Sequence, residues 1–246
     1  MTKFPAHIYL PVLIAICSSA SCVSAGKVST SAGNALIVAH DSLYPPESLK
    51  VEGHTPYTQK HYPERIVRFR REPLRQHDVV FLGNSITEMG GDWEKRLGKP
   101  GIRNRGIGGD ISAGVLQRLG EIVFARPAAV FLLIGINDLM FTEITPEKLS
   151  ENILEIASRL HRQSPKTKIF IQTILPTNRK DLASKISETN RLISAHQRPG
   201  KFILVDLHAL FADGHDLMKK ELTTDGVHLN EQGYAVWVEK IKPFFR

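Results

Sequence analysis

Asp225 and His228 have the residue types and the spacing that catalysis by an activated hydroxyl requires. They stand three positions apart in the run Thr-Asp-Gly-Val-His-Leu, residues 224–229, so a single turn can bring the carboxylate to the imidazole ring. A carboxylate that fixes the tautomer of a histidine allows the other ring nitrogen to accept a proton from a hydroxyl group. The pair therefore predicts an acid and a base that need a serine from another part of the chain.

The candidate serine is Ser85, which follows the apolar residues 79–82 and the pair Gly83 and Asn84. The apolar run is long enough for a buried strand, and open α/β sheets bind their ligands at the carboxyl ends of strands. Serine, glycine and asparagine are also ordinary turn residues, so this stretch alone is more typical of a simple turn. The prediction of Ser85 as a nucleophile therefore depends on whether other catalytic groups are expected at the same edge of the sheet.

Two further loops carry groups that can donate hydrogen bonds to a negatively charged oxygen. Gly109 ends the glycine-rich run of residues 106–109 and offers a backbone N–H that no side chain screens. Asn137 follows an apolar run that ends at Gly135. A tight turn at Gly109 and a helix cap at Asn137 are the structural alternatives. Residues 106–110 read Gly-Ile-Gly-Gly-Asp. This run lacks the last glycine of the dinucleotide-binding pattern G-x-G-x-x-G, so it does not predict nucleotide binding.

The elements that must position these residues alternate along the chain. Strand-like apolar runs lie at residues 79–83, around 102, and at 128–135, 168–174 and 202–207, and helical patterns lie at residues 92–97, 112–124, 146–161, 182–196 and 230–241. Strands that are apolar on both faces and alternate with helices predict a parallel sheet covered on both sides. We expect an α/β fold, a three-layer α/β/α sandwich with a five-stranded, mainly parallel, doubly wound sheet of the flavodoxin-like kind.

The first 25 residues differ from the rest of the chain. An apolar run at residues 8–16 follows Lys3, and small residues then lead to Ala25, which is typical of an export signal cleaved after that alanine. A membrane anchor, or a lipid attached to Cys22, is the alternative. The protein is expected to be secreted or periplasmic.

Three parts are predicted: a signal peptide at residues 1–25, an N-terminal extension at 26–76 and a catalytic domain at 77–246. Within the extension, residues 26 to about 60 are rich in Ser, Pro, Gly and His and are expected to be irregular, and a short helix is expected at 63–71. Thr145-Pro146 and Asn230 are typical of helix starts within the domain.

The formal net charge of +7 is concentrated in an arginine-rich stretch, with arginines at positions 65, 68, 70, 71 and 75. Acidic residues are interleaved with them and no stacking aromatic residues accompany them, so we interpret this stretch as a solvated helix face and predict no nucleic-acid partner.

The two cysteines fall in the predicted signal peptide. No zinc-like spacing connects five of the histidines, which are read as surface or packing residues: His40, His54, His61, His77 and His161. No metal or organic cofactor is expected.

Together these motifs resemble the SGNH (GDSL) hydrolase superfamily, in the order of that family and over about residues 78–241. The matching blocks are Gly-Asn-Ser-Ile-Thr at 83–87, Gly109, Gly-Ile-Asn-Asp at 135–138 and Asp-Gly-Val-His at 225–228. Residues 104–110 and 226–234 are most similar to platelet-activating-factor acetylhydrolase subunits and related bacterial acyl esterases. One departure is Asn84, which stands where the family usually has Asp.

The resemblance implies a serine esterase, a carboxylic ester hydrolase that works through an acyl-enzyme. Ser85 would be the nucleophile, His228 the base and Asp225 the residue that orients the base. The oxyanion hole would consist of the backbone N–H groups of Ser85 and Gly109 and the side-chain amide of Asn137. Short-chain esters, above all acetyl esters of carbohydrates, are the expected substrates.

Two alternatives stay open: a lipid esterase of the platelet-activating-factor or lysophospholipase type, and a non-catalytic glycan-binding module on the same fold. An acyl pocket bordered by Trp93, Leu139, Met140 or Phe141 is also expected, although each of these could instead be a core residue. The expected partner is a small ester or an acetylated glycan, without stable membrane insertion. A homodimer is compatible with the sequence but not required by it.

Overall fold

The computed structural model describes residues 42–197 and 200–245, so the predicted signal peptide lies outside the described residues. Its centre is a five-stranded sheet in which all strands run parallel, in the order β2-β1-β3-β4-β5. The strands are β1 (Val79–Gly83), β2 (Ile102–Gly106), β3 (Ala129–Leu133), β4 (Lys168–Gln172) and β5 (Ile203–Val205). This is the flavodoxin-like strand order, and the predicted fold class is confirmed.

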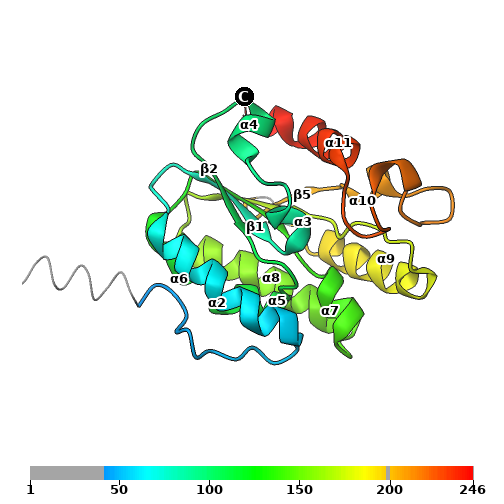
Figure 1. Ribbon diagram of the computed structural model, residues 1–246. Coiled ribbons are helices and arrows are strands. Elements are labelled where there is room, and N and C mark those ends of the chain that lie inside the picture. Colours follow the sequence, from blue (N-terminus) through cyan, green and yellow to red (C-terminus); the bar gives the residue numbers. More distant parts are fainter. Residues whose placement is uncertain (1–41, 198–199, 246) are drawn as a thin grey trace, which may run out of the picture.

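Helices cover both faces of the sheet, which lies between them in Figure 1. On one side lie α4 (Trp93–Leu97) and α11 (Glu231–Ile241), and on the other lie α5 (Ser112–Gln117), α6 (Gly120–Ala125) and α8 (Pro146–Gln163). The central strand β3 is buried at all of its positions, as expected for a strand with helices on both faces. Among the described residues, no helix has both the length and the apolar character of a membrane span.

The remaining helices of the described chain are short, apart from α2 and α9. They are α2 (Pro56–Arg71), α3 (Ser85–Glu88), α7 (Ile136–Phe141), α9 (Lys180–Ala195), α10 (His208–Phe211) and the 3₁₀ turns η1 (Lys220–Leu222) and η2 (Lys242–Phe245). The single helix predicted over 112–124 is divided into α5 and α6. The two predicted helix starts are confirmed, because the Thr145 side chain accepts the Lys148 N–H and the Asn230 side chain accepts the Gly233 N–H.

Helix α2 is longer than the sequence predicted, because it begins at Pro56 and carries Pro63 in its interior. The Thr55 hydroxyl oxygen caps its first turn by accepting the Thr58 N–H at 3.2 Å. Proline has no N–H group, and at the first helical position that group would have no partner within the helix, so Thr55 and Pro56 form a strong helix start. The assignment of residues up to about 60 as irregular was therefore wrong for the last part of that segment.

Part of the predicted extension packs onto the domain as a satellite core. Tyr62, Ile66 and Phe69 of α2 are buried together with Ile107, which follows β2. Arg65 is only 9% exposed and donates two hydrogen bonds to the carbonyl oxygen of Gly106. The interpretation of the arginine stretch as a solvated face is thus wrong for Arg65.

Candidate active site

Ser85 is the first residue of α3 and lies two residues beyond the end of β1. The intervening Asn84 caps the helix, because its Oδ1 accepts the Ile86 N–H at 3.1 Å. A side chain at Gly83 would collide with the carbonyl oxygen of Leu133 and with Thr87, so only glycine fits this sharp exit from the strand. The turn therefore presents the serine hydroxyl at the carboxyl edge of the sheet.

The hydroxyl of Ser85 is part of a chain of hydrogen bonds that includes the predicted acid and base. Its Oγ lies 3.0 Å from Nε2 of His228, and Nδ1 of the same ring lies 2.7 Å from Oδ2 of Asp225. The other carboxylate oxygen, Oδ1, accepts the backbone N–H groups of Val227 and His228 at 2.9 and 2.7 Å. The structure thus brings together the three residues that the sequence singled out.

The environment of Asp225 keeps its carboxyl group ionised. Burial raises its pKa, but hydrogen bonds from the His228 ring and from the backbone N–H groups of His228 and Val227 outweigh this effect and lower the pKa to about 2. An ionised carboxylate can hold the Nδ1–H tautomer of His228, which leaves Nε2 free to accept the serine proton. The side chains of His228 and Asp225 are 29% and 53% exposed, so this chain of groups is open to solvent.

Gly109 lies on the loop after β2, and Asn137 lies in the first turn of α7, shortly after β3. The register of the sheet pairs Gly83 with Gly106 of β2 on one side and with Leu133 of β3 on the other, so the loops after these strands start level with the serine turn. Gly109 has a φ of +77°, a region that favours glycine. Nδ2 of Asn137 donates to the carbonyl oxygen of Asp110 at 2.9 Å, which connects the two loops. An amide group has two N–H donors, so the second can serve an oxyanion.

Asp110, which follows Gly109, anchors the glycine loop and was not singled out by the sequence. Its carboxylate is fully buried between Nε2 of His54 at 3.1 Å and the Arg118 guanidinium at 2.9 Å. His54 is therefore a packing residue, as the sequence suggested, but one that belongs to the support of this loop. The signal in the sequence that could have identified Asp110 is its position directly after the glycine run.

Asp138, next to Asn137, is a second buried carboxyl group behind the site. Both of its oxygens lie 3.0 Å from the Ser112 N–H, and Oδ1 accepts the Ser112 hydroxyl. Burial raises the pKa of Asp138 to about 7, more than the hydrogen bonds from Ser112 lower it. This group is therefore expected to change its protonation state near neutral pH.

The residues predicted to border an acyl pocket differ in how far they are buried. Trp93 is 1% exposed and stacks on Phe81 with ring centroids 4.2 Å apart, so it is a core residue and its prediction as a substrate contact was wrong. Leu139 is also buried, at 4% exposure, and Met140 packs partly against the main core. Phe141, at the end of α7, is 52% exposed and is the member of this set that can meet a ligand. In the described part of the chain, no group of three or more His, Cys, Asp or Glu residues could hold a metal ion.

Known proteins share the fold of this chain. The model of the GDSL-like Lipase/Acylhydrolase family matches residues 81–236, which include all the candidate site residues. The structure of a GDSL-like lipase from Bacteroides thetaiotaomicron VPI-5482 is 27% identical, with a TM-score of 0.66 over 72% of this chain and 95% of that one. An acetyl xylan esterase, AlAXEase, shares the fold at 21% identity, with a TM-score of 0.58 over 69% of this chain and 100% of that one.

A curated relative is an N-acylneuraminate cytidylyltransferase from Escherichia coli O18:K1:H7 (strain RS218 / NMEC), 25% identical over 182 residues. The match covers 72% of this chain and 42% of that protein, so the chain spans about two fifths of the length of this relative. The family model, in contrast, covers well over half of the chain. The chain therefore belongs to the GDSL-like lipase/acylhydrolase family and is a carboxylic ester hydrolase.

Proposed function

We propose that the protein is an exported serine esterase that removes short acyl groups, acetyl groups above all, from carbohydrates. The observation that carries the serine mechanism is the continuous hydrogen-bonded chain from Ser85 through His228 to Asp225. No metal or organic cofactor is invoked in this mechanism. The proposal of export rests on residues 1–25 of the sequence alone.

In the first half of the reaction, Oγ of Ser85 forms a bond to the acyl carbon while Nε2 of His228 takes the hydroxyl proton. The resulting oxyanion accepts hydrogen bonds from the backbone N–H groups of Ser85 and Gly109 and from the Asn137 amide. The tetrahedral intermediate then collapses. The bond to the alcohol oxygen breaks, and His228 passes its proton to the leaving alcohol.

In the second half, water takes the place of the alcohol. His228 accepts a proton from the water as its oxygen attacks the acyl carbon, and then returns a proton to Ser85 as the acid leaves. Asp225 stays ionised throughout and stabilises the imidazolium that forms twice in each cycle, which fits the low pKa of its carboxyl group.

Three observations support a carbohydrate ester as the substrate. The catalytic side chains are open to solvent, which suits an ester on a bulky glycan. Exposed aromatic rings, which can pack against sugar rings, are available from Tyr57 at the start of α2 and Phe141 at the end of α7, 63% and 52% exposed. The chain also shares its fold with an acetyl xylan esterase.

A lipid ester is the second candidate, and a specific observation favours it. Met89, directly after α3, is 53% exposed, and together with Phe141 it provides apolar surface on two elements that begin at the site. An acyl chain could cover this surface. Hydrolysis of p-nitrophenyl esters of increasing chain length separates the two, because a carbohydrate acetylesterase should lose activity beyond the shortest chains.

The experiment that tests the proposed function combines labelling with a substrate panel. A fluorophosphonate probe should label the wild type but not Ser85→Ala, and the same variant should lose hydrolysis of p-nitrophenyl acetate while keeping its melting temperature. Acetylated xylan and acetylated neutral and acidic sugars should then be compared as substrates. Full activity of Ser85→Ala would overturn the mechanism, and a wild type that neither takes up the probe nor hydrolyses any ester would favour a binding module.

A further inference from the structure

Glu88, the last residue of α3, connects the serine turn to the glycine loop. It lies on the same short helix as Ser85, three residues further along the chain. Its Oε2 accepts the backbone N–H of Gly108 at 2.5 Å. Gly108 directly precedes Gly109, the residue whose N–H we assign to the oxyanion. One carboxylate thus joins the helix of the nucleophile to the loop of an oxyanion donor.

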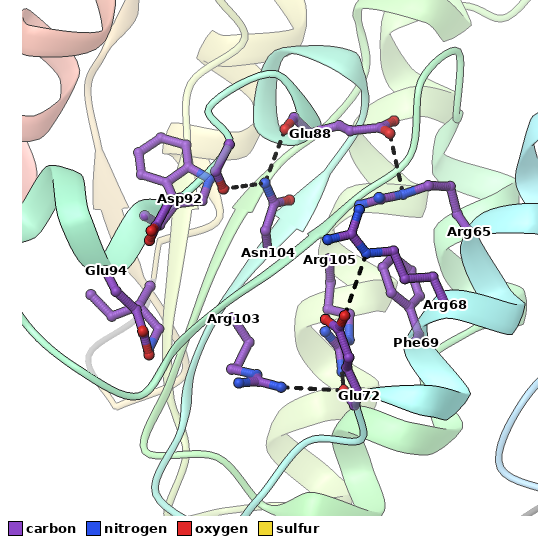
Figure 2. A pocket seen from close by; sticks show the side chains of 13 residues that line it. Arg65, Arg68, Phe69, Glu72, Glu88, Asp92, Glu94, Arg103, Asn104 and Arg105 are labelled. Atoms are coloured by element: carbon purple, nitrogen blue, oxygen red, sulfur yellow. Dashed lines mark hydrogen bonds and ion pairs between the residues drawn. The ribbon is translucent and has the colours of Figure 1, made fainter.

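Helix α2, from the predicted extension, supplies two partners that orient this carboxylate. Nε2 of His61 lies 2.9 and 3.1 Å from the two Glu88 oxygens, and Nε of Arg65 lies 3.3 Å from Oε1. The ion pair of Arg65 with Glu88 is drawn in Figure 2, where the two side chains reach toward each other from different elements. The side chains of Glu88, His61 and Arg65 are 20%, 21% and 10% exposed, so these contacts are partly shielded from water.

The same two helices hold the glycine loop from other sides. Arg65 also donates to the carbonyl oxygen of Gly106, and a side chain at Gly109 would run into Thr58 of α2. Gly108 has the tips of Tyr57, His61 and Glu88 at contact distance from the place of a missing Cβ. The backbone of the loop is therefore enclosed by α2 and by the end of α3.

Charge explains why Glu88 needs these partners. A lone carboxylate near a developing oxyanion would oppose the negative charge of the transition state. The guanidinium of Arg65 offsets that charge, while the carboxylate keeps its role as acceptor for the Gly108 N–H. Hydrogen-bond donors that are already in position before the reaction contribute most to stabilising an oxyanion. A small displacement of this loop should therefore lower the rate of the chemical step.

We propose that Glu88, oriented by His61 and Arg65, is a positioning residue that sets the Gly109 N–H relative to Ser85. This inference rests on the proposed function, because it assigns an oxyanion-binding role to Gly109. It also gives the extension a part in catalysis that the sequence did not indicate.

The test compares Glu88→Ala and Glu88→Gln with the wild type and with Glu64→Gln as a matched control. Glu64 is a 59% exposed acid of α2 whose Oε2 lies 3.6 Å from Nδ1 of His61, the ring that also contacts Glu88. With p-nitrophenyl acetate, Glu88→Ala should lower kcat by roughly 10- to 100-fold, less than the loss of a whole oxyanion donor, with KM changed by less than about twofold. Glu64→Gln should match the wild type.

A second readout separates positioning from a merely structural role. Phenylboronic acid forms a tetrahedral adduct with an active serine, so its Kd should rise in Glu88→Ala by the same factor as kcat/KM falls. Glu88→Gln keeps the size of the side chain and one acceptor oxygen, and should show a smaller change of the same kind. It also decides the matter if Glu88→Ala does not fold.

The outcomes distinguish this inference from the proposed function. If the wild type and Glu64→Gln hydrolyse the ester and take up the fluorophosphonate, the proposed function stands. Glu88 variants with an unchanged kcat, or with a change in KM alone, would then overturn the positioning role. A wild type that neither hydrolyses esters nor reacts with the probe would overturn both.

Discussion

Nε2 of His228 lies 3.0 Å from Oγ of Ser85, although 143 residues separate the two in the sequence. A second contact between the same parts of the chain maintains this approach. The Tyr234 hydroxyl, on the helix that begins just after His228, donates to the Ile86 carbonyl oxygen at 2.8 Å, and Ile86 directly follows the serine. Helices α3 and α11 are thereby joined beside the site, and this hydrogen bond helps to hold the base next to the nucleophile.

Replacing Asp225 with Asn should leave the fold intact and slow the chemical step. The Asn side chain would present an N–H₂ group to Nδ1 of His228, which favours the tautomer that cannot accept the serine proton. The expected loss in kcat is on the order of 10³- to 10⁴-fold with little change in KM, measured with p-nitrophenyl acetate. A loss smaller than about tenfold would show that His228 does not depend on this carboxylate.

Replacing Asn137 with Ala removes a donor from the proposed oxyanion hole and also the hydrogen bond to the Asp110 carbonyl oxygen. If the amide stabilises the oxyanion, kcat should fall on the order of 10²- to 10³-fold. The loop contact alone should chiefly affect stability, so the melting temperature is measured in parallel. An effect confined to KM would mean that Asn137 binds substrate only.

The parts of the site that could be predicted from the sequence are those that local order determines. Ser85 and Asn137 each follow an apolar strand within a few residues, and Asp225 and His228 share one turn. The three inner strands, β1, β3 and β4, are nearly continuous apolar runs, because they are covered on both faces. Residues chosen by these local signals are the ones that the structure brings to one edge of the sheet.

The parts that could not be predicted depend on where α2 lies. Pro63 suggested a helix start, whereas the helix tolerates it in its interior and begins at Pro56. The contact between His61 and Glu88 joins residues 27 positions apart on different elements, and no local pattern fixes such a pair. Residue type also did not reveal that Trp93 points into the core, because aromatic side chains are common both in cores and at ligand sites.

The buried carboxyl group of Asp138 should make stability depend on pH near neutrality. Its pKa of about 7 in the folded protein is raised above the unfolded value of about 4, so its contribution to stability is fully present below about pH 4 and is lost as the pH rises through about 7. Each pH unit in that interval should reduce the free energy of unfolding by about 1.4 kcal/mol at most. Asp138→Asn cannot ionise and should lack this dependence.

Urea unfolding of the wild type and Asp138→Asn at pH 5 and pH 8 measures the effect. The other titrating groups cancel in the difference between the two proteins at each pH. The wild type should lose stability relative to the variant between pH 5 and pH 8. A constant difference across this range would contradict the raised pKa of Asp138.

Gly109 should be intolerant of a side chain for two separable reasons. Its φ of +77° disfavours any residue with a Cβ by about 1–2 kcal/mol, and that Cβ would also overlap the Thr58 hydroxyl of α2. Gly98→Ala is a matched control, because Gly98 has a φ of +65° and nothing within 4 Å of the added methyl group. Gly109→Ala should therefore lower the free energy of unfolding more than Gly98→Ala, and it alone should lower kcat.

The double variant Gly109→Ala, Thr58→Ala isolates the overlap from the backbone strain. Removing the Thr58 hydroxyl takes away the atom that meets the added Cβ most closely, so the double variant should be more stable than the sum of the two single changes predicts. Chemical denaturation of the wild type, the two single variants and the double variant gives the coupling free energy. A kcat of the double variant that exceeds that of Gly109→Ala would show that the loop of Gly109 has regained its position. If the changes in the free energy of unfolding are strictly additive, the Thr58 side chain of α2 does not restrict residue 109. Other contacts would then determine the position of the loop.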